Sequence, residues 1–364
     1  MAPELSTLAD EACAAGLEAG LDAVGVAAAE PFADTRRHLE ERKAAGLHGG
    51  MHFTYGDPAR STDPDRALAG ARAIVVGARS YRRAAPDRAG HDPGGGPAGV
   101  VARYSWDDAY VPLRAALGET ARRLQADGWR ARVLADDNAL VDREAAHRAG
   151  LGWYGKNTNL LLPGRGSWFV LGSVVTDAPL PPAPAPVEDG CASCTRCLPA
   201  CPTGALVAPG LLDARRCLAW LLQADGDFPV EYREALGGRI YGCDECQEVC
   251  PPNRAATRRH PPPPAQPDAE PSVPLVQLLE ASDDELLARY GRWYIPRRQP
   301  RYLRRNALVA LGNVGDGGDP ATVAVLRRAL AGEDRMLREH AAWAAVRLGR
   351  TDLVPAPSAR AVPV

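Results

Sequence analysis

The chain has 364 residues, enough for two or three domains that each bury a core. Hydrophobic residues make up 46% of it and charged residues 24%, which excludes a fully disordered chain, a collagen-like repeat and a coiled-coil rod. The formal net charge is −2, so any surface that binds nucleic acid has to be local. The sequence has no apolar run near 18 residues, and its N-terminal segment is typical of an amphipathic helix rather than a signal peptide, so we expect a cytoplasmic protein without a membrane span.

After this N-terminal helix, strands and helices alternate up to about residue 180. A Gly- and Pro-rich loop at 85–99 interrupts them. In chain order the patterns predict an apolar segment at 24–26, a strand at 73–77, a helix at 111–128, a strand at 130–135, a helix at 139–149 and a strand at 168–175. This alternation predicts an α/β domain over residues 1–180.

Two proline-rich stretches, 179–190 and 261–274, divide the rest of the chain. Eight of the nine cysteines lie between them. Beyond the second stretch, amphipathic segments at 303–311, 321–330 and 336–348 predict short paired helices of a HEAT-like kind. Asp319 followed by Pro320 predicts a helix N-cap with proline in the first turn.

The eight cysteines have the spacing of iron–sulfur ligands. The first run is C-x2-C-x2-C-x3-C-P, the second is C-x2-C-x3-C-P, and one further cysteine lies between them; the residues are Cys191, Cys194, Cys197, Cys201, Cys217, Cys243, Cys246 and Cys250. The first run is that of bacterial ferredoxins, in which the cysteine before proline ligates the other cluster. This crossing gives a first [4Fe–4S] cluster on Cys191, Cys194, Cys197 and Cys250, and a second on Cys201, Cys217, Cys243 and Cys246.

Two zinc sites are the alternative for these cysteines, but zinc does not explain two runs that end in Cys-Pro. Cys13, in the N-terminal helix, is expected to be a small buried hydrophobe. Two clusters transfer electrons one at a time, and we expect the group that accepts these electrons to lie in the N-terminal domain. A dinucleotide or P-loop site is not expected there, because the sequence has neither G-x-G-x-x-G after a strand nor a Walker A motif.

Four segments resemble the tRNA epoxyqueuosine reductase family, in the same order and over nearly the whole chain. They are Asp136–Asn159 (DDNALVDREAAHRAGLGWYGKNTN), Leu212–Leu218, Ile240–Asn253 and Arg305–Asn313 (RNALVALGN). The resemblance implies an α+β multidomain chain: a cobalamin-binding α/β domain at 1–180, a ferredoxin-like two-cluster domain at 181–260 and a HEAT-like helical tRNA-binding domain at 275–364. The implied activity is the last step of queuosine modification, reduction of the epoxide of epoxyqueuosine at the tRNA wobble position. It would use cobalamin, two [4Fe–4S] clusters and an external low-potential electron donor, in a monomer.

The resemblance also assigns site residues. The departing epoxide oxygen needs a general acid, and the family's proton donor aligns with Asp136, although the neighbouring Asp137 is an alternative that the family pattern lacks. Asp142 is expected to be a charge on a helix face. The candidate cobalamin contacts are Arg60, Tyr104, Asp136, Lys156, Asn157, Asn159 and Ser167. For Tyr104 and Trp153, core packing is an equally open interpretation.

Residues 286–315 contain seven arginines and no acid, with Tyr290, Trp293, Tyr294 and Tyr302 interleaved. Such a pattern predicts phosphate contacts with aromatic rings that stack on bases, and a solvated helix face is the alternative. The residues expected to bind tRNA are Arg297, Arg298, Arg304 and Arg305.

Two rival functions share some of these features. A small-molecule reductase of the reductive dehalogenase type would use cobalamin and two clusters but would not need the arginine-rich segment. A non-catalytic iron–sulfur electron carrier would not need a large domain with an acid at the end of a strand.

Overall fold

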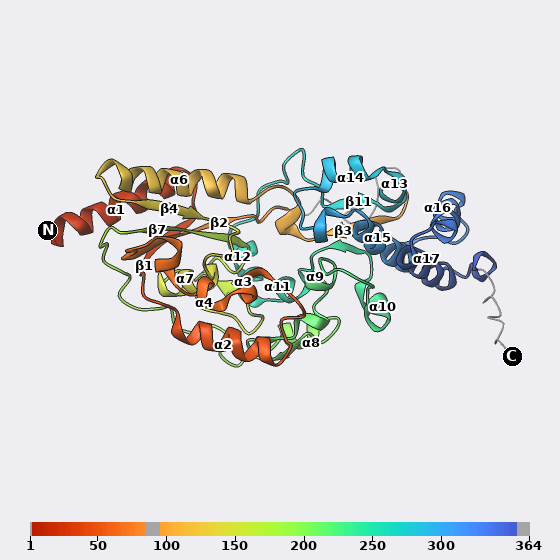
Figure 1. The fold of residues 1–364 in the computed structure, drawn as a ribbon, viewed down its shortest axis with the longest axis horizontal. Coiled ribbons are helices and arrows are strands. Elements are labelled where there is room, and N and C mark those ends of the chain that lie inside the picture. The colour runs from red at the N-terminus through yellow and green to blue at the C-terminus, as the bar shows by residue number, and fades with distance from the viewer. Residues whose placement is uncertain (1, 85–94, 355–364) are drawn as a thin grey trace. The chain divides into compact units, whose positions relative to one another are not determined.

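The computed structural model describes residues 2–84 and 95–354 (Figure 1). The chain packs as two compact units. Unit 1 comprises Met1–Ala84, Asp107–Cys217 and Asp244–Ala265, and unit 2 comprises Ala85–Trp106, Leu218–Cys243 and Gln266–Val364. This division differs from the three consecutive domains expected from the sequence, which stay a prediction. The cysteine-rich segment is shared between the units because its central stretch, with Leu218, Leu222 and Phe228, packs in one core with Val309.

Unit 1 is built on a four-stranded sheet in the order β1-β2-β7-β4, in which every neighbouring pair is antiparallel. Its strands are β1 (Ala23–Ala28), β2 (Ala73–Ser80), β7 (Phe169–Thr176) and β4 (Ala131–Leu134). These are the strands that the apolar patterns predict, but the expected α/β domain is corrected to an α+β arrangement. The connections return each strand antiparallel to its neighbour rather than forming parallel β-α-β units.

Helices cover both faces of this sheet. The long helices α1 (Ala2–Glu18) and α6 (Tyr110–Ala126) pack together over one face, and α7 (Asp142–Arg148) packs on β1, β2 and β7 from the other (Figure 1). The core on the α7 side includes Ile74, Val76 and Ala145, all fully buried. Alternate side chains of β2 therefore pack against the helices on opposite faces of the sheet. Cys13 on α1 is partly buried, and burial raises the pKa of its thiol to about 11.

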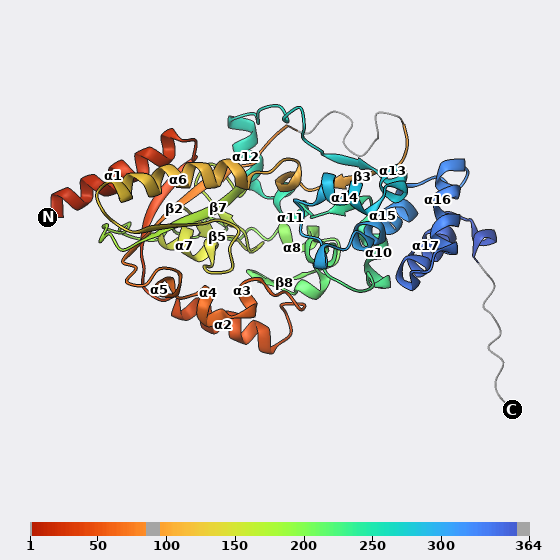
Figure 2. The same ribbon diagram turned by 45° about the horizontal axis from the view of Figure 1, so that its top comes forward.

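Short elements complete unit 1. After β1 come α2 (Ala33–Ala44), α3 (Phe53–Gly56), α4 (Pro58–Ser61) and α5 (Pro64–Ala67). The cysteine-rich part adds the hairpin β5 (Trp153–Tyr154) and β6 (Leu160–Leu161), then α8 (Cys197–Ala200), β8 (Leu206–Ala208), β9 (Leu211–Leu212), α11 (Glu245–Glu248) and α12 (Pro251–Arg259). Helix α12 packs against α11, and Figure 2 shows the segment in a second view.

Unit 2 combines a small sheet with helices. The sheet has the order β10 (Arg239–Tyr241), β3 (Ala98–Val101) and β11 (Ser272–Pro274), with β3 parallel to β10 and antiparallel to β11. Strands β3 and β11 lie at the edges of stretches expected to be loops. The helices are α9 (Leu218–Leu221), α10 (Arg233–Leu236), α13 (Leu275–Glu280), α14 (Asp283–Tyr290), α15 (Arg301–Val314), α16 (Pro320–Ala331) and α17 (Arg335–Arg347).

The last three helices confirm the predicted amphipathic segments. Asp319 caps α16 as expected, because its carboxylate accepts hydrogen bonds from the backbone N–H groups of Ala321 and Thr322. Helix α17 packs against both α15 and α16. The HEAT-like classification stays a prediction. Within the described residues, each helix is too short or too polar to cross a bilayer.

Candidate functional site

Four cysteines of unit 1 surround one cavity of about 80 Å³. They are Cys191, Cys194, Cys197 and Cys250, the set that the crossing rule assigns to the first cluster. The pKa of the Cys250 thiol is raised to about 11, chiefly by burial and to a smaller extent by the neighbouring thiols, against a backbone hydrogen bond from Asn253 that lowers it. The fold therefore brings Cys250 to the triplet Cys191, Cys194 and Cys197, from which it is separated by more than fifty residues of sequence.

The geometry of these thiols fits an iron–sulfur cube better than a zinc ion. Zinc requires four ligands converging at about 2.3 Å from one point. In the described part of the chain, no three His, Cys, Asp or Glu side chains converge closely enough to hold a single ion. All nine cysteines are also free of disulfides. Thiols that share a cavity without converging on one point suit a cluster with a metal at each corner.

Apolar side chains shield this cavity. Trp153 and Leu161 of the β5–β6 hairpin form a buried cluster with Cys250, and Cys191 packs against it. Gly190 is required beside the indole, because a Cβ there would lie 2.6 Å from the ring of Trp153. Of the two interpretations left open for Trp153, the structure supports core packing, here against the cluster ligands.

Cys201 has a different environment, although it follows the triplet closely. Burial opposes ionisation, but hydrogen bonds from the backbone N–H groups of Leu206, Thr203 and Ala205 lower the pKa of its thiol overall. The N–H of Ala205 lies 3.2 Å from Sγ. Such donors stabilise a thiolate, the form that binds metal. The ligand set expected for the second cluster stays a prediction.

The loop between β5 and β6 supports the cysteine segments. Lys156 Nζ donates to the carbonyl of Ala192 at 2.5 Å, and Asn157 Nδ2 donates to the carbonyl of Cys246 at 3.2 Å. Asn157 Oδ1 also accepts from the N–H of Asn159. The Asn157 side chain is buried, and both ends of its amide hold the loop against the peptide of Cys246; its expected cobalamin contact stays a prediction.

Ser167 also departs from its expected role. Its hydroxyl donates to Gln247 Oε1 at 2.9 Å and accepts from Asn253 Nδ2 at 3.0 Å, and its side chain is buried. These contacts support a structural role for Ser167, and its expected cobalamin contact stays a prediction. Gln247 and Asn253 are supporting residues that sequence reasoning missed, although both lie in the segment Ile240–Asn253 that carries the resemblance.

Tyr104 belongs to unit 2. Its hydroxyl accepts a hydrogen bond from Gln223 Nε2 at 3.3 Å, and its ring centroid lies 6.1 Å from that of Tyr241. These contacts favour the packing interpretation of Tyr104.

The predicted proton donor lies on a strained turn at the end of β4. Asp136 has φ of 55°, a left-handed conformation that costs a non-glycine residue about 1–2 kcal/mol. Partial burial raises the pKa of its carboxyl; Arg114 opposes this rise, and the charges of Asp108 and Asp137 add to it. The side chain is nonetheless accessible and has no hydrogen-bond partner among the residues described.

The carboxylate of the neighbouring Asp137, unlike that of Asp136, has a hydrogen-bond partner in the described part of the chain. Asp137 Oδ1 accepts the N–H of Ala139 at 2.9 Å, so this carboxylate stabilises the turn. Asp142, at the start of α7, is predicted to be a charge on a helix face. Instead, burial and then the nearby Asp136 raise the pKa of its carboxyl well above the ordinary value. Tyr110, which the sequence did not single out, also has its pKa raised by burial and by the charge of Asp136.

Arg60 lies on α4, which is joined to the proton-donor segment. The N–H of Val141 donates to the carbonyl of Ser61 at 2.9 Å, so α4 adjoins the chain between Asp136 and α7. The guanidinium of Arg60 and the side-chain amide of Asn159 make no hydrogen bond to another described residue. Arg60, Asp136 and Asn159 thus keep polar groups available for a ligand.

The arginine-rich segment of unit 2 is largely neutralised by acids distant in sequence. The ion pairs are Arg289–Glu270 at 2.5 Å, Arg297–Asp225 at 3.1 Å, Arg301–Asp334 at 2.8 Å and Arg304–Asp283 at 2.5 Å. At least four of the seven arginine charges are therefore paired with a carboxylate in the folded chain. Arg298 instead donates to the carbonyl of Gly291.

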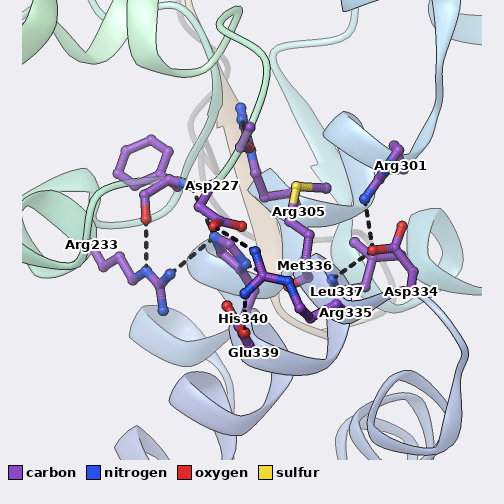
Figure 3. Close-up of polar contacts among 12 residues, drawn as sticks. Asp227, Arg233, Arg301, Arg305, Asp334, Arg335, Met336, Leu337, Glu339 and His340 are labelled. Atoms are coloured by element: carbon purple, nitrogen blue, oxygen red, sulfur yellow. Dashed lines mark hydrogen bonds and ion pairs between the residues drawn. The ribbon is translucent and has the colours of Figure 1, made fainter.

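Arg305 is wholly buried, which argues against its expected role in tRNA binding. Figure 3 draws Arg305 among labelled side chains of α15 and α17. Its guanidinium donates to the carbonyls of Leu221, Ala224 and Gly226 at 3.0, 2.8 and 2.7 Å. The adjacent Asn306 donates to the carbonyl of Leu222 at 2.8 Å. These residues support the segment between two cysteines and present no charge to a phosphate.

Three of the four interleaved aromatic residues are also internal. Tyr290, Trp293 and Tyr302 are buried, and the first two rings stack with centroids 4.7 Å apart. Tyr294 is 43% exposed. Of this group, Tyr294 is therefore the residue able to offer a ring face to a base.

Comparisons with known proteins agree with this geometry. Residues 190–253 match the family described as "4Fe-4S double cluster binding domain". The chain is 35% identical to epoxyqueuosine reductase of Bacillus anthracis, over 91% of this chain and 86% of the relative. It is also 35% identical to that of Pseudomonas aeruginosa, over 96% and 97%.

Two solved structures are similar over almost the full length. One is an epoxyqueuosine reductase with an epoxyqueuosine-modified tRNA-Tyr stem loop, at a TM-score of 0.85 and 32% identity, covering 95% of this chain and 91% of that one. The other is the Bacillus subtilis epoxyqueuosine reductase with an aspartate catalytic loop swung out of the active site. It has a TM-score of 0.82 and 31% identity, covering 94% and 91%.

Proposed function

This chain belongs to the epoxyqueuosine reductase family, and we propose that it reduces the epoxide of tRNA-bound epoxyqueuosine to the alkene of queuosine with cobalamin and two [4Fe–4S] clusters. The reaction consumes two electrons and two protons and releases the epoxide oxygen as water. The observation that carries the proposal is the set of four thiols around one cavity in unit 1. The dehalogenase and carrier alternatives are not favoured.

The first cluster would be held by the cysteines that line this cavity, Cys191, Cys194, Cys197 and Cys250. The second would take Cys201, Cys217, Cys243 and Cys246. The backbone donors around Cys201 support its role as a thiolate ligand. When loaded, the clusters supply single electrons. The protein excludes water from the first with Trp153 and Leu161.

Cobalamin fits the polar groups that unit 1 leaves unused. The corrin carries amide side chains and a phosphate, which need hydrogen-bond donors and acceptors. Arg60, Asn159 and the carboxyl of Asp136 offer them, and Lys156 adds an ammonium group, whereas Asn157 and Ser167 are fully engaged by the protein. When bound, cobalamin would supply the reducing metal for cleavage of the carbon–oxygen bond.

Asp136 would protonate the departing oxygen. Its raised pKa keeps a larger fraction of its carboxyl protonated near neutral pH, which a general acid requires. Asp137 is engaged with Ala139, which favours Asp136 over its neighbour. The Bacillus subtilis relative with a mobile aspartate catalytic loop supports this assignment.

The tRNA would contact unit 2 through Arg297 and Arg298. Both residues have a left-handed backbone conformation, with φ of 51° and 54°. Two consecutive strained residues are typical of functional sites, which supports this role. Arg297 is 72% exposed, and Tyr294 offers an exposed ring nearby in the sequence. The relative solved with a modified stem loop supports tRNA as the substrate. We further propose a monomer of the cytoplasm that takes electrons from an external low-potential donor.

The test is anaerobic single-turnover reduction of an epoxyqueuosine-bearing tRNA stem loop, with reconstituted protein, reduced methyl viologen, and cobalamin either added or withheld. We expect queuosine only with cobalamin present. Equal product without cobalamin would exclude the cofactor, and no product in either case would exclude the reaction.

A further inference from the structure

Helix α12 lies between two open hollows on unit 1. One hollow, of about 270 Å³, includes Arg82, Arg165 and His260. The other, of about 400 Å³, includes Arg254 and Arg258. Both belong to a unit whose cluster ligands are already described, and neither contains a residue that the proposed reaction uses.

The basic residues of α12 and of the segments beside it are here called the α12 surface: Arg82, Arg165, Arg254, Arg258, Arg259 and His260. The C-terminal end of α12 joins the parts, because Arg82 donates to the carbonyl of His260 at 2.7 Å. The Arg259 guanidinium lies near Gly164, where an added Cβ would be 3.5 Å from Nη1.

The acids that line these hollows are Asp22, which pairs with Arg165, and Glu248. Four lining arginines therefore outnumber two carboxylates, and Arg259 beside Gly164 adds a further positive charge. Basic residues in the last turn of a helix also stabilise its dipole, which could account for Arg258 and Arg259. That effect does not account for Arg82 or Arg165, which come from other segments.

This surface is connected to the first cluster by a single turn of helix. Cys250 is the N-cap of α12, and the N–H of Arg254 donates to its carbonyl at 3.0 Å. At about 1.5 Å per residue, Arg254 lies about 6 Å and Arg258 about 12 Å along the axis from this cluster ligand. An electron that arrives at the α12 surface is thus close to a cluster thiolate.

We propose that the α12 surface is the docking site of an acidic one-electron carrier protein, which reduces the first cluster. The inference rests on the proposed function, in which each epoxide consumes two electrons. Each encounter oxidises the carrier by one electron and reduces the cluster by one, so two encounters serve one turnover and no bond changes at the interface. Electron-transfer complexes are small and transient, and opposite charges raise their rate of encounter.

The position of the surface favours this occupant over RNA. A carrier needs to approach a cluster, and α12 begins at a cluster ligand. A phosphate backbone has no such need, and the strained, exposed arginines proposed to bind tRNA belong to unit 2.

The test compares two triple variants of the holoenzyme by stopped-flow reduction of the clusters under anaerobic conditions. One is Arg254→Gln, Arg258→Gln and Arg259→Gln. The matched control is Arg36→Gln, Arg37→Gln and Arg122→Gln, which removes three exposed arginines from α2 and α6. The probes are reduced flavodoxin, an acidic carrier, and reduced methyl viologen, a small cation.

At low ionic strength we expect the α12 variant to be reduced by flavodoxin at least about tenfold more slowly than wild type, because steering contributes about 10- to 1000-fold to such rates. The difference should shrink as salt is added. The control variant should keep the wild-type rate, and reduction by methyl viologen should change less than about twofold in both.

An unchanged flavodoxin rate in the α12 variant would overturn the proposal. A weaker affinity for the tRNA stem loop with an unchanged flavodoxin rate would assign the surface to RNA and would also overturn it. Failure of the proposed function is a separate result, since wild-type enzyme with methyl viologen would then form no queuosine.

Discussion

Arg305 offers the sharpest test of how unit 2 uses its arginines. We expect Arg305→Met to destabilise unit 2 and leave no specific defect in phosphate binding. The guanidinium makes three hydrogen bonds of 2.7–3.0 Å to the carbonyls of Leu221, Ala224 and Gly226. Methionine fills much of the space but removes the guanidinium that donates to these three carbonyls.

The size of the effect follows from these contacts. Hydrogen bonds to charged groups contribute about 1.5–3 kcal/mol each, but they are not additive, and burial of the cation offsets part of the gain. Burial lowers the pKa of Arg305 to about 10, so the group still carries its charge at neutral pH. We therefore expect a loss of about 3 kcal/mol in the free energy of unfolding. In a unit of roughly 150 residues this lowers Tm by about 6–12 °C.

Differential scanning calorimetry of the anaerobic holoenzyme measures this shift, with Arg297→Met as the matched control. Arg297 is 72% exposed, and its ion pair with Asp225 should contribute less than about 1 kcal/mol. Iron content gives a second readout, because the carbonyls that Arg305 binds lie between Cys217 and Cys243. An Arg305→Met protein with the Tm of the wild type but a weaker affinity for tRNA would refute the structural role of Arg305.

Three further predictions concern the site. Asp136→Asn should abolish turnover while the iron and corrin contents stay unchanged. In the wild type, turnover should fall as the pH rises through the raised pKa of Asp136, because the protonated carboxyl is the proton donor. A rate that does not depend on pH would exclude this role. Cys250→Ala should lower iron from about eight to about four atoms per chain by metal analysis, and a full complement would exclude Cys250 as a ligand. Arg297→Gln with Arg298→Gln should weaken stem-loop binding and flatten its salt dependence in filter-binding titrations, whereas equal slopes would move the RNA surface elsewhere.

Local sequence patterns determined much of the structure. The cysteine spacing predicted the set that lines the cavity, because three of its four ligands lie within seven residues of one another. The cap at Asp319 and the apolar strand at β2 were equally predictable, since each depends on neighbours in sequence or on simple periodicity.

Tertiary packing decided the properties that depend on partners distant in sequence. Arg304 is neutralised by Asp283, Arg305 is buried among carbonyls about eighty residues earlier, and Ser167 is held by Gln247. A sequence gives the charge of a side chain but not whether the folded chain supplies its counter-charge or its hydrogen-bond partners. For this reason the four cysteines that line the cavity could be predicted residue by residue, whereas the exposure of each arginine and the polar groups that stay without a hydrogen bond among the described residues emerged only from the folded chain.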